Sequence, residues 1–289
     1  MDITTLYLIA TFIFGLILGS FLNVVVYRYN TGMSIKRGRS KCFSCGRELS
    51  AVDLIPVFSF IFFRGRCRTC KSKISWQYPL VEILTACLLT GIVYVNMMVV
   101  SNWQIALDII IAALLICIGV YDLRHKIIPD GLVYTAAAIA LVKTVVLLLL
   151  HPGVDTSVVL SLLAGPIVAL PFGLLWLVSG GRWMGLGDAK LALVIGWMLG
   201  LSEGFTAIVY SFWVGTVVIL ACLVFGEAIE AFSSKKNALG IQLFRGRTGA
   251  ALKKMFPNFG LRSEIPFGPF MIIGLYIVYF TGRCMFCLV

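Results

Sequence analysis

Two aspartates lie at the edges of long apolar stretches of this chain. Asp122 ends the run from Ile105 to Tyr121, and Asp188 opens another run directly after Gly185-Leu186-Gly187. An ionisable side chain at the edge of a hydrocarbon layer is costly, and it indicates a functional site. Alone, either aspartate would more often be a helix cap or an interfacial side chain. Two carboxyl groups in one site can share a proton and hydrolyse a peptide bond, so we predict that Asp122 and Asp188 form a catalytic pair.

Four cysteines form the second group of residues with a specific chemistry. Cys42 and Cys45 make one C-x2-C pair and Cys67 and Cys70 make another, with 21 residues between the pairs. Each pair can direct two sulfurs at one tetrahedral ion, so the spacing predicts a structural zinc site. Reduced thiols or two disulfides are the alternatives, and a cytosolic location disfavours disulfides. Zinc would fold a loop that is too small to be held together by an apolar core.

The elements that must position these residues are apolar helices. Of the 289 residues, 60% are hydrophobic and 13% are charged, and the mean hydropathy is +0.99. This composition excludes a soluble globular domain, and apolar runs of about 20 residues predict transmembrane helices. We predict an all-α polytopic membrane protein with about eight transmembrane helices, at 5–27, 79–100, 104–121, 131–150, 157–179, 188–201, 204–226 and 266–282.

The distribution of lysine and arginine predicts how these helices are oriented, because basic residues collect in cytoplasmic loops. If the helices alternate, the cytoplasmic segments hold 22 of the 24 basic residues and leave out Lys143 and Arg283. These segments are 28–78, 122–130, 180–190 and 227–264. Both termini are then outside and both aspartates lie at the cytoplasmic face. A seven-helix alternative, which fuses the sixth and seventh runs, would place the basic segment 227–264 outside and is disfavoured.

The net charge of +11 follows from this orientation signal and from contact with anionic lipid headgroups. It therefore needs no nucleic-acid partner. We divide the chain into a first transmembrane helix (1–27), a zinc-ribbon-like cytoplasmic domain with the four cysteines (28–78), and a polytopic transmembrane domain (79–289). Within the last, segment 227–264 is expected to be an amphipathic stretch on the membrane surface or a linker.

Four further polar residues fall within or beside the apolar runs. Glu82 is either interfacial or part of a buried site, near the cytoplasmic start of the second helix. Asn23 is expected to join packed helices, and Asp108 to lie at the outer membrane interface. Asp130 follows Pro129 and is expected to cap the fourth helix at its N-terminus.

Several longer motifs accompany these residues along the chain. They include Gly19 to Arg28, Asp53 to Val57, Arg64 to Cys67, Ile74 to Glu82, Asp122 to Asp130, Met184 to Leu191 and Ile265 to Phe270. In these motifs the chain resembles the type IV prepilin peptidases, also called prepilin leader peptidase/N-methyltransferases, which are GxGD-type membrane aspartic peptidases. The resemblance covers most of the sequence. Segment 227–264 is longer than the corresponding connection expected in the family.

The resemblance implies an endopeptidase of the bacterial inner membrane, with Asp122 and Asp188 as its catalytic pair. Such enzymes remove a short basic leader from type IV prepilin or pseudopilin precursors at the cytoplasmic face. Many members also methylate the new N-terminal amine with S-adenosylmethionine, and the four-cysteine domain accompanies the members with both activities. Glu82 is a candidate contributor to the cofactor site.

Three other functions compete with this interpretation. A general intramembrane protease of the presenilin type shares the Gly-x-Gly-Asp motif, but the cysteine domain and the interfacial aspartates argue against it. A proton- or cation-coupled transporter could use the aspartates as ion ligands, although it would favour acidic residues nearer the middle of the membrane. A zinc-scaffolded membrane assembly protein without catalysis would tolerate replacement of either aspartate.

Overall fold

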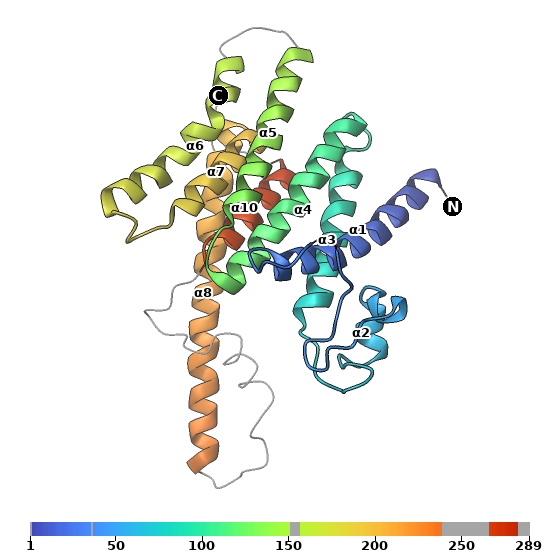
Figure 1. Cartoon of the computed structure of the whole chain (residues 1–289). Coiled ribbons are helices and arrows are strands. Elements are labelled where there is room, and N and C mark those ends of the chain that lie inside the picture. Colours follow the sequence, from blue (N-terminus) through green and yellow to red (C-terminus); the bar gives the residue numbers. More distant parts are fainter. Residues whose placement is uncertain (1, 36, 151–156, 239–265, 283–289) are drawn as a thin grey trace.

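The computed structural model describes residues 2–35, 37–150, 157–238 and 266–282, and these residues form helices joined by short connections (Figure 1). Only two isolated β-bridges occur in this part of the chain, so the predicted all-α fold is confirmed. The elements in chain order are α1 (Ile3–Arg28), η1 (Ala51–Leu54), α2 (Phe58–Phe62), α3 (Gln77–Asn96), α4 (Asn102–His125), α5 (Asp130–Leu150), α6 (Ser157–Ser179), α7 (Leu186–Leu199), α8 (Leu201–Ala238) and α10 (Gly268–Thr281).

Six of the described helices are long and apolar enough to cross a membrane, namely α1, α3, α4, α5, α6 and α8. The chain is therefore a multi-pass membrane protein. The other two predicted runs form α7 and α10, which have 14 residues each and are shorter than a full span requires. Helix α8 does not end at residue 226 as predicted but continues to Ala238, so the first part of segment 227–264 is helical. Residues 239–264 lie outside the described part of the chain.

Helices α1 and α3 cross closely because two glycines on α1 face α3. A Cβ atom on Gly15 would lie 2.5 Å from the Cα of Ala86, and one on Gly19 would lie 2.7 Å from the Cα of Glu82. Asn23 joins the same two helices, since its side-chain amide donates to the carbonyl of Tyr78 at 3.4 Å. The predicted packing role of Asn23 is thus confirmed.

The two helices that carry the aspartates lie in the centre of the bundle. Leu115 and Ile118 of α4, Leu191 and Ile195 of α7 and Leu275 of α10 are all fully buried and belong to one apolar cluster. Burial of this apolar surface fixes how the three helices pack, although the lipid-facing helices around them have no such constraint. The positions of the aspartates are therefore set by the best-packed part of the molecule.

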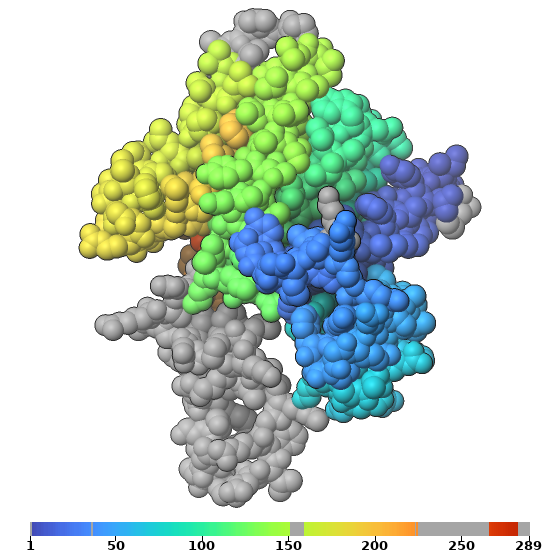
Figure 2. Space-filling model, in the orientation of Figure 1, coloured from blue at the N-terminus to red at the C-terminus, as the bar shows by residue number. Residues whose placement is uncertain are grey.

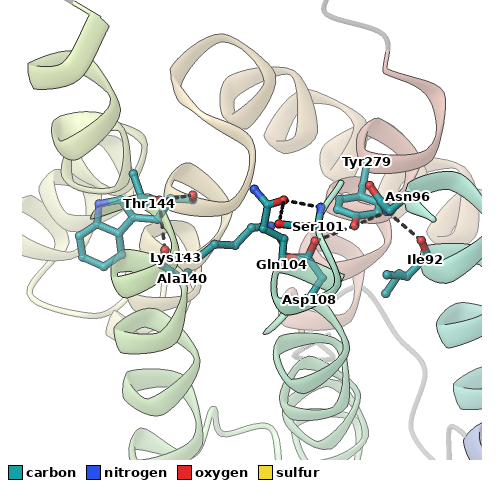
Figure 3. A network of polar contacts seen from close by, with 10 residues as sticks. Ile92, Asn96, Ser101, Gln104, Asp108, Ala140, Lys143, Thr144 and Tyr279 are labelled. Carbon is teal, nitrogen blue, oxygen red and sulfur yellow. Dashed lines mark hydrogen bonds and ion pairs between the residues drawn. The ribbon is translucent and has the colours of Figure 1, made fainter. Parts of the chain in front are cut away.

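A buried polar network ties α3, α4, α5 and α10 together (Figure 3). The carboxylate of Asp108 is 2% exposed and forms an ion pair with Lys143. It also accepts a hydrogen bond from the hydroxyl of Tyr279 at 2.9 Å, and this hydroxyl accepts one from Asn96 at 2.8 Å. Asp108 was predicted to be interfacial; the structure shows that it is also buried between helices, where its partners on α5 and α10 satisfy the charge. The same pairing accounts for Lys143, a cation outside the predicted basic segments.

Replacing Tyr279 by phenylalanine is expected to lower the stability of the bundle, because the buried Asp108 carboxylate loses a donor. Hydrogen bonds to charged groups contribute about 1.5–3 kcal/mol each. Tyr276→Phe on the same helix is a matched control, since the buried Tyr276 hydroxyl has no hydrogen-bond partner among the described residues. Thermal unfolding in detergent should show a lower Tm for Tyr279→Phe alone. Equal Tm values for the two variants would mean that the network adds nothing to stability.

Candidate active site

Asp122 lies in the last turn of α4 and is buried, with a side-chain environment made largely by α10. The backbone N–H of Gly268 donates to its carboxylate. A Cβ atom on Gly268 would lie 2.6 Å from Oδ2 of Asp122, so only glycine leaves room for the carboxylate there. The helix ends at His125, one turn after Asp122, because Lys126 takes a left-handed conformation and its N–H bonds back to the Asp122 carbonyl at 2.7 Å.

Asp188 lies in the first turn of α7 and is partly buried. The N-cap of this helix is Gly185, and the N–H of Asp188 bonds to its carbonyl at 3.3 Å. The two carboxyl groups are near enough for the charge of Asp122 to act directly on Asp188. Thus the structure brings the two predicted residues together across 66 positions of sequence.

Ile128, in the connection between α4 and α5, fills the space around the two carboxyl groups. A Cβ atom on Gly187 would lie 2.9 Å from the Cβ of Ile128, and one on Gly268 would lie 3.4 Å from its Cδ1. The two glycines therefore approach Ile128 from different helices. Because Ile128 is itself buried, it holds the N-terminus of α7 against the end of α4.

An ion pair fixes the same connection from its other side. Nζ of Lys190 lies 2.6 Å from the Asp130 carboxylate and 5.0 Å from the ring centroid of Tyr134. Asp130 is the first residue of α5, and the carbonyl of Pro129 accepts the first helical hydrogen bonds, so the predicted N-cap lies one residue too late. The contact holds α7 to α5 on the Asp188 side of the site.

This arrangement has the parts that acid–base hydrolysis requires. Two carboxyl groups face one another in a partly dehydrated place, where like charges favour the sharing of one proton. Gly185 and Gly187 leave the backbone beside Asp188 without side chains, so an extended peptide can approach closely. Neither carboxyl group forms an ion pair among the described residues, unlike the neighbouring Asp130.

The four cysteines form two knuckles with the same hydrogen-bond pattern. In the first, the N–H of Cys42 bonds to the carbonyl of Arg47 and the N–H of Gly46 bonds back to Cys42. In the second, Cys67 and Lys71 take the places of Cys42 and Gly46. Lys71 adopts the left-handed conformation that glycine has in the first knuckle, with φ of 57°. Sequence spacing alone was enough to predict these turns, because all their hydrogen bonds are local.

The four sulfurs lie within 4.8 Å of one another, and those of Cys42 and Cys70 are 3.8 Å apart. Four tetrahedral bonds of about 2.3 Å place sulfurs about 3.8 Å apart, so the cluster fits a zinc ion. The backbone N–H groups of Cys45 and Ser44 lower the pKa of Cys42 to about 6, which favours the thiolate. The cluster is consistent with a metal site held by Cys42, Cys45, Cys67 and Cys70.

A cavity of about 560 Å³ lies between the four-cysteine region and the ends of α1 and α3. Glu82 lies at its wall and is buried, and Oε2 accepts the backbone N–H of Val57 at 2.8 Å. Of the two alternatives for Glu82, the buried one is confirmed. Aromatic side chains of both parts also line the cavity, namely Tyr27, Phe43, Phe60, Phe63 and Tyr78. Arginines, lysines and serines are also part of the lining, and such a volume with apolar rings and polar groups is typical of a small-molecule site.

The end of α4 contacts the wall of the cavity. The guanidinium of Arg124 lies 4.0 Å from the ring centroid of Tyr27, and Tyr27 lines the cavity. The ring of Tyr27 also contacts Phe43 of the first knuckle at 5.2 Å between centroids, so these three side chains join α4, α1 and the four-cysteine region.

Three residues of the site had no role in the sequence analysis: Gly268, Ile128 and Lys190. Gly268 carried a signal, because a short Pro-Phe-Gly-Pro sequence precedes the last apolar run. Proline at the start of a helix is common, and the glycine before it marks a close approach. No local sequence pattern could identify Lys190 as the partner of Asp130, since the two residues are 60 positions apart.

The fold and the site together define a helical multi-pass membrane protein with two neighbouring aspartates at one end of its bundle and a four-cysteine cluster. Comparison with known proteins agrees with that class. Residues 13–96 match the family model of the bacterial peptidase A24 N-terminal domain, and residues 109–220 match that of the type IV leader peptidase family. The chain belongs to the type IV leader peptidase family, and the resemblance seen in the sequence motifs is confirmed.

Relatives with curated names include a prepilin leader peptidase/N-methyltransferase of Bacillus subtilis, 32% identical over 75% of this chain and 83% of the relative. Proteins of the same name from Aeromonas hydrophila and Pseudomonas aeruginosa are 27% and 26% identical, and each comparison covers 96% of this chain and 91% of the relative. No solved structure matches the chain.

Proposed function

We propose that this chain is an aspartic endopeptidase that removes the basic leader from type IV prepilin or pseudopilin precursors. The observation that carries the proposal is the proximity of Asp122 and Asp188, two carboxyl groups without an ion-pair partner among the described residues, at one end of the bundle. The names of the relatives, which combine leader peptidase with N-methyltransferase, support the choice of substrate. A prepilin has a cytoplasmic leader before an apolar helix, so its cleavage point lies where a membrane-surface carboxylate pair can reach it.

In the proposed reaction the two carboxyl groups hold one proton between them. The ionised group takes a proton from water, whose oxygen adds to the scissile carbonyl carbon, and the protonated group gives its proton to the carbonyl oxygen. A proton then passes to the leaving nitrogen as the tetrahedral intermediate collapses into a carboxylic acid and an amine. The N–H of Gly268 holds Asp122 in position through these steps. The proton belongs to the pair and not to one residue.

The proposal includes a topology in the bacterial inner membrane. Here α7 and α10 complete eight membrane-embedded helices, both termini are outside, and the pair faces the cytoplasm. Residues 1–27 are the first helix, 28–78 the cytoplasmic cysteine domain and 79–289 the peptidase domain. The predicted distribution of basic residues supports this orientation.

Cleavage of a purified prepilin by the purified chain in detergent tests the peptidase, with the product mass as the measurement. We expect a product shortened by its leader, and a further gain of one methyl group when S-adenosylmethionine is added. An intact precursor after long incubation with folded enzyme would overturn the peptidase assignment. A shortened product without the methyl gain would overturn the second activity alone.

The second activity is proposed for the cavity that Glu82 lines. S-adenosylmethionine, when bound, would supply a methyl group to the new N-terminal amine. The buried carboxylate of Glu82 suits a cationic ligand, and the rings of Tyr27 and Tyr78, whose planes are stacked with centroids 5.5 Å apart, offer an apolar surface to an adenine.

Glu82→Gln is expected to weaken S-adenosylmethionine binding by about 10- to 100-fold, because a charged acceptor becomes neutral. The amide oxygen can still accept the N–H of Val57, so the fold is kept. Leader cleavage should stay within a few-fold of the wild-type rate. Calorimetric titration with the cofactor measures the effect, and Glu48→Gln, an exposed carboxylate on the same region, is the control. Equal affinity in both variants would place the cofactor elsewhere.

We also propose that zinc occupies the four-cysteine cluster and holds the 28–78 region in its folded form. Replacing the buried Cys67 by serine is expected to remove the metal from the purified chain and to expose this region to proteases. Cys87→Ser, at an exposed cysteine of α3 outside the cluster, should keep both metal and protection. Metal content by mass spectrometry and limited proteolysis measure the outcome. A wild-type chain without bound zinc but with equal protection would contradict the proposal.

A further inference from the structure

Helix α2 (Phe58–Phe62) exposes three large apolar side chains on one side. Phe62 is 79% exposed, and Phe58 and Ile61 are exposed to a similar degree. They are spaced at i, i+3 and i+4, which places them on one face of a helix. We call Phe58, Ile61 and Phe62 the α2 face. A concentrated apolar surface of this kind on so small a region indicates contact with something other than water.

The start of α2 lies beside the spanning helices and not beyond their ends. The N–H of Val57, the residue before α2, bonds to Oε2 of Glu82 at 2.8 Å. Glu82 lies five residues into α3, which is about 7.5 Å along the helix axis. The backbone of Glu82 also packs against Gly19, nine residues before the end of α1. Figure 1 shows α2 beside the first turns of α3.

The backbone at this point is held in a strained turn. Val57 has a φ of 61°, and the N–H of Phe58 bonds to the carbonyl of Pro56 at 2.6 Å, which together make a tight γ-turn. A β-branched residue in this conformation costs about 1–3 kcal/mol, so the surrounding contacts must hold it. The residues that follow this turn divide into two groups. Phe60 and Phe63 line the cavity, whereas the α2 face does not take part in it.

An apolar stripe of a membrane helix lies beside α2. Trp76, Leu80 and Leu84 are exposed at helical spacing, so they form the outward side of α3. The ring of Phe60 lies 4.8 Å from that of Trp76, which immediately precedes α3, so α2 packs at this end of the stripe. In the space-filling view the four-cysteine region forms a lobe directly below α1 and next to α3 (Figure 2).

A basic residue follows the α2 face closely. Arg64, two residues after the helix, is exposed and does not line the cavity, whereas Arg66 and Arg68 do line it. An apolar helix face followed by an arginine fits a segment in the interface of an anionic membrane, because the apolar side chains enter the acyl region and the guanidinium group meets phosphates.

We propose that α2 is inserted in the cytoplasmic leaflet, with the α2 face among the acyl chains and Arg64 at anionic headgroups. The four-cysteine region is then anchored to the bilayer at a second place besides its connections to α1 and α3. This surface is independent of either proposed reaction. Insertion of α2 fixes the height of the cavity relative to the membrane surface, because the cavity-lining Phe60 and Phe63 lie in and directly after α2.

Photocrosslinking in vesicles tests the insertion directly. The chain is purified with p-benzoylphenylalanine in place of Phe62, reconstituted in vesicles of phosphatidylglycerol and phosphatidylethanolamine, irradiated and analysed by mass spectrometry. Phe43 is the matched control position, since it is 76% exposed on the same region but faces the cavity. We expect at least about tenfold more lipid adduct at position 62 than at position 43, because burial of three large apolar side chains favours contact by more than that factor.

Each alternative result has a definite meaning. Equal lipid adduct at the two positions, or none at position 62, would overturn the proposal. A crosslink from position 62 to a second copy of the chain would assign the α2 face to a protein interface instead. As a second measurement, Arg64→Gln should reduce the adduct at position 62 in these vesicles. An unchanged amount of lipid adduct would mean that anionic headgroups do not hold the α2 face in the membrane. None of these readouts depends on leader cleavage.

Discussion

Asparagine at position 122 or 188 is expected to reduce leader cleavage by about 10³- to 10⁴-fold, because an amide can neither give nor take the proton that hydrolysis requires. The substitution keeps the size and shape of the side chain, so α4 and α7 stay packed. The double variant should be no slower than the slower single variant, since the two carboxyl groups act as one unit. The measurement is the rate of leader removal from a prepilin in detergent, with folding checked by thermal unfolding.

Asp130→Asn is the matched control for these variants. Its carboxylate lies at the same end of the bundle, but it is exposed and paired with Lys190 at 2.6 Å. Exposed ion pairs contribute about 0–1 kcal/mol, so cleavage should stay within a few-fold of the wild-type rate. If the variants at 122 and 188 cleave as fast as this control, the aspartates are structural and the proposed mechanism is wrong.

Alanine at position 268 is expected to lower kcat by about 100-fold, although it adds only one methyl group. That group would lie 2.6 Å from Oδ2 of Asp122, so either the carboxylate or the start of α10 must move. Pro269 restricts the backbone beside it, and a displacement of about 1 Å in a catalytic group can cost about 100-fold in rate. KM for the prepilin should change little, because Gly268 contacts the catalytic group and not the leader in this arrangement.

Gly215→Ala on α8 is the corresponding control. A Cβ atom there would lie 3.5 Å from the ring of Phe270, which is an ordinary contact, so activity should be nearly unchanged. Comparison of kcat for the two alanine variants therefore separates a clash at the carboxylate from a general loosening of α10. Normal activity of Gly268→Ala would mean that Asp122 does not need its present position for catalysis.

The sequence was sufficient for features that depend on local spacing. The knuckle around Cys42 and that around Cys67 are closed by hydrogen bonds over a few residues, so the C-x2-C pattern contains the information. The apolar runs predicted the helices for a similar reason, because length and hydropathy are properties of one segment. The end of α8 was misplaced at residue 226, since hydropathy falls after Gly226 but the helix continues through this glycine to Ala238.

Features that depend on which helices meet were harder to predict. Asp122 and Asp188 could be paired because both lay at the same predicted membrane face. The contact of Gly268 with Asp122 could not be predicted, because it depends on how α10 packs in the core. Asp108 was assigned to the interface for the same reason: its position in the run gave no sign of Lys143 or Tyr279, which are 35 and 171 positions away.

The Asp108–Lys143 pair also bears on how the chain enters the membrane during synthesis. A lysine within a helix opposes insertion by about 2.5–3.5 kcal/mol near the helix centre. Asp108 precedes Lys143 along the chain, so α4 is already made when α5 leaves the ribosome. The two helices can then insert as a neutralised hairpin, and Tyr279, near the C-terminal end, completes the network only after the rest of the bundle exists. Translation order thus supplies the anion before the cation that needs it.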